Sequence, residues 1–533
     1  MEVDCIPFRK TGYFSPLICD YLDQKEALAP FYNRFPTLEN FEAQILEKQK
    51  TYDSNQRGVL VNSLRNQYRG FKLSEATRTN IIDLEKKETF TVVTGHQLNL
   101  FTGPLYFLYK IVSTLNMVDR LREKYPHFNF VPVYWMATED HDFDEINFFN
   151  FKGQKVQWNQ DATGAVGRRS TRGLDEVLET WSARLDASVH AKKLIELFTT
   201  SYLEQDRLAE ATRFLVNTLF GKYGLVIVDG DDADLKRLLV PYAKKDIFEK
   251  IPFAQVSRSI RLLSQVSDTY KIQVNPREIN YFYLKEGLRE RLVFKDDIYA
   301  VNNTDIVFSQ SELEDELEKH PERFSPNVIA RPLYQEVILP NLSYIGGGGE
   351  LAYWLELKSY FDALGVSFPI LLLRNSALLM TEKQGDKIKK LQLDSSDLFL
   401  KQTSFINKKI REISNIDINF TPQKQHLEKQ FALLYDLAEQ TDSTFIKAVK
   451  AQEIKQKKGL DVLEKRLLKA QKRKLKDHVV RMTDIQNELF PNQSLQERQL
   501  NFSEAYLEIG PKLIDWLVAH LNPLESSFFI LRH

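Results

Sequence analysis

A short stretch, residues 91–104, places a strand, a glycine turn and the start of a helix next to one another. The β-branched residues 91–94 predict a strand that ends at Gly95, and Pro104 opens a segment whose apolar residues recur every three or four positions. Proline is tolerated in the first turn of a helix, so we expect the helix to begin there. This order of elements directs backbone N–H groups and the positive end of a helix dipole toward an anion.

A second apolar run, residues 130–137, follows this helix and is typical of a buried strand. Strand, helix and strand in succession predict a βαβ unit, and therefore a parallel sheet with a right-handed crossover. Residues 225–228, 338–345 and 368–373 have the same apolar character, so we predict further strands of one doubly wound sheet. The predicted fold class is therefore α/β, with a Rossmann-like parallel-sheet core.

The densest acidic cluster of the chain, residues 138–145, directly follows the second strand. Parallel strands end at one edge of the sheet, so we expect this cluster and His96 to face one crevice. The carboxylates could cap a helix, hold Mg²⁺ or bind a substrate ammonium. Either His141 or Asp142 could accept a proton from an attacking amine, and Asp142 is our choice of general base.

Four glycines, residues 346–349, precede a predicted helix over 351–364. Without Cβ atoms they let the backbone approach an anion and adopt positive φ, although a tight turn would also use them. The spacing matches neither a P-loop nor a dinucleotide-binding fingerprint. Glu350, in the first helical turn, could cap the helix or bind an amine or hydroxyl.

Charge and cysteine content exclude several classes of protein. The 72 basic and 73 acidic residues leave a net charge of −1, so no global field favours nucleic acid or an anionic membrane. Cys5 and Cys19 lack metal-ligand spacing, which favours a reducing compartment. No apolar stretch approaches the roughly 20 residues that span a bilayer. We expect a cytoplasmic protein with small-molecule partners and neither a nucleic-acid nor a membrane partner.

Beyond residue 381 glycine nearly disappears and long helical patterns begin. Apolar residues recur there at three and four positions, as in a coiled-coil seam: Leu427, Phe431, Leu434, Ala438, Leu460, Leu463, Leu467 and Ala470. A break near 441–444, or near Gly459, would allow an antiparallel hairpin. The basic segment 450–476 lacks interleaved aromatic residues, so a solvated helix face is favoured over an RNA-binding one.

These patterns divide the chain into two predicted domains. The first, residues 1–384, is the Rossmann-like core with a helical lead-in and two insertions, near 150–200 and 260–325. The second, residues 385–533, is a helical coiled-coil domain.

The residues described so far also match a known family, in order along essentially the whole chain. The chain resembles the bacillithiol-biosynthesis cysteine-adding enzymes of the BshC family. The segments that carry the resemblance are 94–106, 131–143, 324–328, 331–333, 344–354 and 495–501.

The resemblance implies a core of the class I aminoacyl-tRNA-synthetase type, two connecting-peptide insertions and a coiled coil that forms a homodimer. It implies the last step of bacillithiol synthesis, in which a ligase joins the carboxyl of cysteine to the amine of glucosaminyl-malate. ATP or another nucleotide would activate the carboxyl, and Mg²⁺ could assist. Two motifs of the larger superfamily differ here, because Gly95-His96-Gln97 replaces His-x-Gly-His and Arg374-Asn375-Ser376 replaces a Lys-Met-Ser-Lys-Ser loop.

We therefore predict a crevice with the catalytic residues Asp142, His141 and His96, and with no metal ligands identified. The predicted substrate- or nucleotide-binding residues are Thr94, Gly95, Gln97, Asn99, Gly103, Glu139, Asp140, Asn327, Arg331, Gly346, Gly347, Gly348, Gly349, Glu350, Tyr353 and Arg374. The alternative is a non-catalytic nucleotide-binding assembly protein that recruits partners through its coiled coil.

Overall fold

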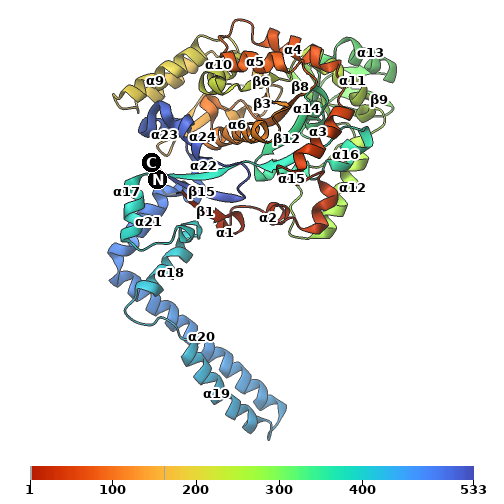
Figure 1. Cartoon of the computed structure of the whole chain (residues 1–533). Helices are drawn as coiled ribbons and strands as arrows, with labels where there is room; N and C mark the ends of the chain where they lie inside the picture. The colour runs from red at the N-terminus through yellow and green to blue at the C-terminus, as the bar shows by residue number, and fades with distance from the viewer. Residues whose placement is uncertain (1–2, 161–162) are drawn as a thin grey trace. The chain divides into compact units, whose positions relative to one another are not determined.

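The computed structural model describes residues 3–160 and 163–533, which form two compact units (Figure 1). Unit 1 comprises Met1–Leu379, Gln496–Leu531 and His533, and unit 2 comprises Met380–Leu495 and Arg532. Residues 161–162, within the first predicted insertion, lie outside the described residues, as do residues 1–2. Among the described residues, no helix combines the length and apolarity that crossing a membrane requires.

The centre of unit 1 is the predicted parallel sheet, with the strand order β13-β12-β2-β3-β6. The strands are β2 Thr89–His96, β3 Asn129–Met136, β6 Val226–Asp229, β12 Asn341–Gly346 and β13 Ile370–Leu373. Helix α6, Tyr106–Lys124, connects β2 to β3, so the predicted strand–turn–helix–strand unit is confirmed. The chain leaves the centre in opposite directions on either side of β2, which makes the gap between β2 and β12 a topological switch point.

Apolar side chains on both the strands and the flanking helices form the core of this unit. Helix α6 packs on β2, β3 and β12, and α3, Asn40–Thr51, packs on β12 (Figure 1). The fully buried members include Phe41, Ile45, Phe90, Val92, Met117, Val118, Leu342 and Ile370. Burying each such side chain contributes about 1.5–3 kcal/mol to the stability of the fold. The packed core therefore holds the strands, and with them the residues at their ends, in position.

Two insertions interrupt the sheet connections. The first contains the hairpin β4 Phe148–Phe151 and β5 Gln154–Gln157 and the helices α8 Leu174–Ser182, α9 Val189–Phe198 and α10 Leu208–Phe220. The second contains an antiparallel sheet, with β7 Tyr281–Lys285, β8 Leu288–Lys295, β9 Ile298–Val301, β10 Val307–Phe308 and β11 Phe324–Pro326. The strands of this insertion begin at Tyr281. Residues 271–280 are irregular, in keeping with Pro276, which cannot donate to a strand ladder.

Three further features differ from the sequence-based prediction. The predicted helix over 351–364 is two helices, α15 Gly348–Trp354 and α16 Lys358–Leu364, separated by a turn. The predicted strand over 338–345 starts only at Asn341, because the helix α14, Ala330–Ile338, precedes it. Near the chain ends, β1 Val3–Pro7 pairs antiparallel with β15 Ser527–Arg532.

The segment Gln496–Leu531, which the sequence grouped with the coiled coil, belongs to unit 1. Its short helices have no long apolar repeat, and they pack on the core instead: α24, Leu513–His520, lies on α6. Asn116 of α6 donates hydrogen bonds to the backbone oxygens of Val518 and Leu521, at 2.9 and 2.5 Å.

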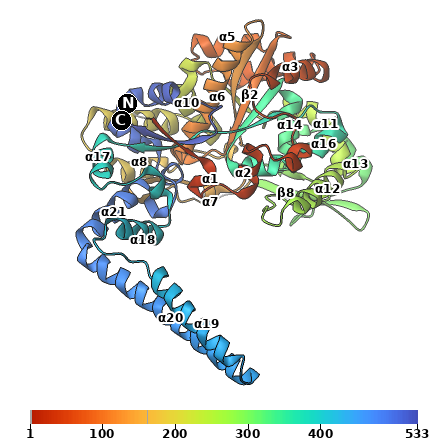
Figure 2. The same ribbon diagram turned by 60° about the horizontal axis from the view of Figure 1, so that its bottom comes forward.

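Unit 2 contains a hairpin of two long helices, α19 Thr421–Ala438 and α20 Ser443–Lys474 (Figure 2). The break lies at the first predicted position, whereas Gly459 lies inside α20. Phe431, Ala438 and Val449 are buried together, but the predicted seam residues Leu434 and Leu463 are exposed. Each helix has only one partner within the hairpin, so only one stripe of its apolar residues is covered.

Candidate active site

A cavity of about 750 Å³ opens where β2, β3 and β12 end, at the switch point of the parallel sheet. Its walls come from the turn after β2, the loop after β3, the start of α15 and the irregular segment 271–280. A volume of this size suits small ligands. All of its lining residues belong to unit 1.

Most of the predicted site residues line this cavity: Gly95, His96, Gln97, Glu139, Asp140, His141, Asp142, Asn327, Arg331, Gly347, Gly348, Gly349, Glu350, Tyr353 and Arg374. Four others do not. The Thr94 hydroxyl donates to the backbone oxygen of Ile345 at 2.8 Å, and Asn99 donates to the backbone of Glu145 at 3.1 Å. Gly346 and Gly103 lie where a Cβ atom would come within 3 Å of a neighbouring side chain.

Gly103 ends a strained turn between β2 and α6. Phe101, Thr102 and Gly103 have φ angles of 48°, 68° and 61°, and a Cβ atom on Gly103 would lie 2.6 Å from that of Asn99. Left-handed backbone is unfavourable for residues other than glycine. Asn501 holds the turn, because its amide donates to the backbone oxygens of Phe101 and Gly103, both at 2.7 Å.

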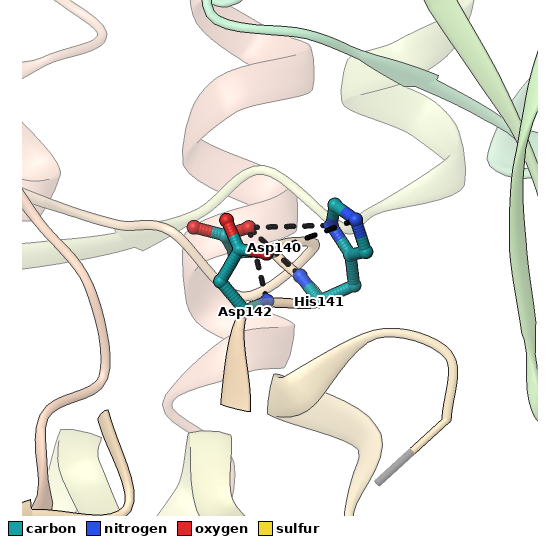
Figure 3. A group of neighbouring side chains, drawn as sticks. All are labelled: Asp140, His141 and Asp142. Carbon is teal, nitrogen blue, oxygen red and sulfur yellow. Dashed lines mark hydrogen bonds and ion pairs between the residues drawn. The ribbon is translucent and has the colours of Figure 1, made fainter. Parts of the chain in front are cut away.

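The acidic wall of the cavity consists of Asp140, His141 and Asp142 (Figure 3). Asp140 accepts hydrogen bonds from the backbone N–H of His141 and from the Gln97 amide, both at 2.8 Å. Burial alone would raise the pKa of Asp140, but these hydrogen bonds and the charge of Arg289 lower it below its usual range. Asp140 is therefore held as a carboxylate.

His141 and Asp142 differ in what they can accept. A nitrogen of the Arg289 guanidinium lies 2.6 Å from His141 Nδ1, and guanidinium groups only donate, so this ring nitrogen acts as the acceptor. The other ring nitrogen, Nε2, lies 3.8 Å from Asp142 Oδ1. Asp142 is exposed, and no lysine or arginine among the described residues forms an ion pair with it, which makes it our choice of proton acceptor.

These three residues also offer ligand atoms within 4.8 Å of one another, as a metal site would need. Their present partners do not fit a bound ion. His141 Nδ1 is occupied by Arg289, whose positive charge would repel a cation, and both oxygens of Asp140 already accept hydrogen bonds. We therefore derive no chemical step through a metal at this cluster.

Another part of the cavity lining, the cationic wall, contains Lys110 and Arg374. Lys110, on α6, is 3% exposed, and its ammonium donates to the backbone oxygen of Gly95 at 2.7 Å and pairs with Glu350 at 2.6 Å. Burial would raise the pKa of Glu350, but Lys110 and hydrogen bonds from Gly347 and Tyr344 lower it. Arg374 forms a buried ion pair with Glu497 at 2.7 Å. The charges on this wall are thus largely paired within the protein.

The tetraglycine turn differs from its prediction. None of its four glycines has positive φ, so their backbone needs no left-handed conformation. The backbone N–H of Gly347 donates to Glu350 at 2.8 Å, which means that a carboxylate of the protein already caps this helix. The absence of Cβ atoms has a steric use at Gly346, where a Cβ would lie 2.8 Å from Leu351.

Three buried nitrogen atoms of cavity residues have no hydrogen-bond partner among the described residues: His96 Nε2, Arg331 Nη2 and Arg374 Nε. Burial, together with the charges of Lys110 and Arg374, lowers the pKa of His96 well below its ordinary value, so its ring is neutral. Buried polar atoms are normally paired, and a partner is therefore expected from a bound molecule. A carboxylate or phosphate oxygen would accept from such nitrogens.

A second, larger cavity of about 960 Å³ lies beside the end of β6. The acidic residues that follow this strand are paired within the protein: Asp231 binds Arg168 and Lys236, and Asp232 caps α11, Ala233–Ile247. Glu139 likewise pairs with Lys236, at 2.6 Å. We assign the site to the smaller cavity, because it lies at the switch point and contains the unpaired nitrogens.

Several cavity residues were not predicted from the sequence: Tyr106, Lys110, Gln273, Arg277, Arg289 and Arg498. Lys110 offered a signal, since a lysine interrupts the apolar face of a predicted helix. Arg277 and Arg289 belong to the second insertion, and no local pattern indicates that this insertion folds over the sheet edge.

The parallel sheet, its two insertions and the cavity at the switch point define a Rossmann-like α/β protein with a ligand crevice. A family model described as the N-terminal Rossmann-like domain of bacillithiol biosynthesis BshC matches residues 1–375, and one for its C-terminal coiled-coil domain matches residues 377–533. The chain therefore belongs to the bacillithiol biosynthesis BshC family.

Relatives described as "Putative cysteine ligase BshC" match over their whole length. A protein of Flavobacterium johnsoniae is 58% identical, with 100% of both chains covered, and one of Christiangramia forsetii is 58% identical, with 100% of this chain and 99% of the relative covered. A Bacillus cereus relative is 28% identical over 97% of each chain.

Proposed function

We propose that this protein is a ligase that joins the carboxyl of cysteine to the amine of glucosaminyl-malate, the last step of bacillithiol synthesis. The observation that carries this proposal is the polarity of the cavity. Its lining contains both the proton acceptor Asp142 and the unpaired nitrogens of His96 and Arg331. Amide formation needs both features, a base for the amine and donors for the carboxyl.

The proposed chemistry uses these residues in fixed roles. The amine nitrogen attacks the carbonyl carbon of the activated cysteine carboxyl, and Asp142 takes the proton that the nitrogen loses. His96 Nε2, in the tautomer that carries its proton, and Arg331 donate to the carboxyl oxygens and orient them. The leaving group departs from the carbonyl carbon as the amide bond completes.

We propose that a nucleotide such as ATP makes the carboxyl reactive. Support comes from Arg374, which lines the cavity and whose Nε has no hydrogen-bond partner among the described residues, so that it would hold phosphate oxygens. When bound, the nucleotide would transfer a phosphorus-containing group to one carboxyl oxygen, so that this oxygen can leave the carbonyl carbon together with that group.

The direct test is a reaction with the purified protein. Cysteine, glucosaminyl-malate and one nucleotide at a time are incubated with it, and bacillithiol is sought by mass spectrometry. We expect product with at least one nucleotide. Absence of product with every nucleotide, from protein whose melting curve shows that it is folded, would contradict the proposal.

We also propose that the protein is a cytoplasmic homodimer. Exposed apolar residues of α19 and α20 support the dimer, since Leu433, Leu437 and Leu463 are 70%, 59% and 51% exposed. Large apolar patches on a surface helix mark interaction sites. The free thiols of Cys5 and Cys19 support a reducing compartment.

A further inference from the structure

A short segment of unit 1, Gln496–Asn501, is fastened to the core on both sides of Arg498. Gln496 exchanges two hydrogen bonds with the backbone of Leu379, both at 2.9 Å. Glu497 pairs with Arg374 at 2.7 Å and accepts the backbone N–H of Ala377 at 3.1 Å. This part of the segment is buried and immobilised by polar contacts.

The other end of the segment is held by the strained turn after β2. Asn501 is fully buried and donates to the turn at Phe101 and Gly103, and the backbone N–H of Leu105 donates to Leu500 at 2.7 Å. Fixing a side chain and its backbone costs conformational entropy, which a bound ligand then does not have to overcome. The anchors therefore preorganise whatever lies between them.

Arg498 lies between the anchors and lines the cavity beside Tyr106 and Arg374. It is exposed, and among the described residues no carboxylate pairs with it. The neighbouring cations are different, because Arg374 is neutralised by Glu497 and Lys110 by Glu350. The guanidinium of Arg498 thus adds a positive charge to the cavity lining that no carboxylate among the described residues compensates.

We propose that Arg498 is a substrate-binding residue, which holds an oxyanion through the forked donors of its guanidinium. The cysteine carboxyl is assigned to His96 and Arg331, which leaves two reactants with such a group, the nucleotide through its phosphates and glucosaminyl-malate through its malate carboxylates. The inference rests on the proposed function for the identity of these reactants. It does not require turnover, because binding of each ligand is measured separately.

The test compares Arg498→Ala, Arg498→Lys and the wild type as full-length proteins. Calorimetry measures binding of ATP alone and of L-malate alone. We expect Arg498→Ala to lower the affinity for one of the two ligands by roughly 10-fold or more, in keeping with the loss of a charge-assisted hydrogen bond. Arg498→Lys keeps the charge but not the fork, so part of the affinity should return. The weakened ligand identifies the source of the oxyanion.

Arg120→Ala is the matched control, because Arg120 lies on an exposed position of α6 and does not line the cavity. Its affinities should equal those of the wild type, and the melting temperatures of all variants should agree within a few degrees. Unchanged affinity of Arg498→Ala for both ligands would overturn the proposal, and so would a wild type that binds neither. Failure of the ligase reaction with intact binding of ATP or L-malate would instead count against the proposed function.

Discussion

Asp142 is the residue on which the proposed chemistry depends most directly. An Asp142→Asn variant keeps the size of the side chain but cannot take a proton, so we expect kcat to fall by roughly 10²–10⁴-fold. Its stability should be unchanged, because the side chain is exposed. Asp144→Asn is the control, since Asp144 is also exposed but does not line the cavity. Equal rates for both variants would contradict the assignment of Asp142 as the base.

The ion pair between Lys110 and Glu350 should matter for stability at the same scale. Lys110→Met leaves the Glu350 carboxylate without its cation, and breaking a buried pair in this way costs about 3–5 kcal/mol. Urea denaturation measures the loss. The double variant Lys110→Met/Glu350→Gln also removes the unpaired charge of Glu350, and should recover part of the lost stability. A single variant as stable as the wild type would show that the pair contributes nothing.

Asp246, at the end of α11, predicts a pH dependence of stability. It is fully buried, its carboxylate accepts the backbone N–H of Asn280 at 3.0 Å, and burial raises its pKa to about 7. The folded protein therefore holds a proton that the unfolded chain releases above about pH 4. Stability is lost as the pH rises from about 4 to about 7, by at most about 4 kcal/mol.

The measurement is the free energy of unfolding of the wild type relative to Asp246→Asn, at several pH values. Asparagine keeps an oxygen that accepts from Asn280 but cannot ionise. We expect the free energy of unfolding of the variant to increase relative to that of the wild type as the pH rises from 4 to 7. A difference that stays constant over this range would mean that Asp246 does not titrate there.

At the scale of elements, the irregular segment 271–280 is the part of the cavity wall with the least regular structure. Glu356, after α15, holds it by accepting the backbone N–H of Gln273 at 2.9 Å. Glu356→Ala removes this acceptor, so amide hydrogen exchange over 271–280 should become roughly 10-fold faster. Glu356→Gln keeps an acceptor and should exchange nearly as the wild type does. Equal exchange in all three proteins would show that the segment is held elsewhere.

The sequence predicted helices and strands correctly where the burial of an element alone determines its pattern of apolar residues. Apolar runs found the parallel strands, because burial on both faces selects such residues. The break between α15 and α16 was missed, since residues 351–364 keep a helical apolar pattern across the turn. The seam of the coiled coil was only partly found, because spacing cannot say which of several apolar stripes a partner covers.

At the scale of the whole molecule, the exposed leucines of the hairpin predict how the chain assembles. Leu437→Lys places a charge in the proposed dimer interface and should raise the dissociation constant by at least roughly 10-fold. Light scattering coupled to size-exclusion chromatography reports the mass. Leu262→Lys, at an exposed position of α12, Ile251–Val266, is the control and should leave the mass unchanged. A monomeric wild type would contradict the dimer.

The sequence by itself predicted the parallel-sheet core and the turn after β2, because these features depend on patterns of adjacent residues. It also named many of the residues that the structure places in the cavity lining. Only the tertiary structure decided which charges are paired. Glu350 caps its own helix and pairs with Lys110, and Arg289 forms a hydrogen bond with Nδ1 of His141. The spacing of these residues in the sequence does not reveal any of these contacts. The return of Gln496–Asn501 to the core, and with it Arg498, likewise depends on long-range hydrogen bonds. Such contacts join residues far apart in the chain, and their energies exist only once the chain has folded.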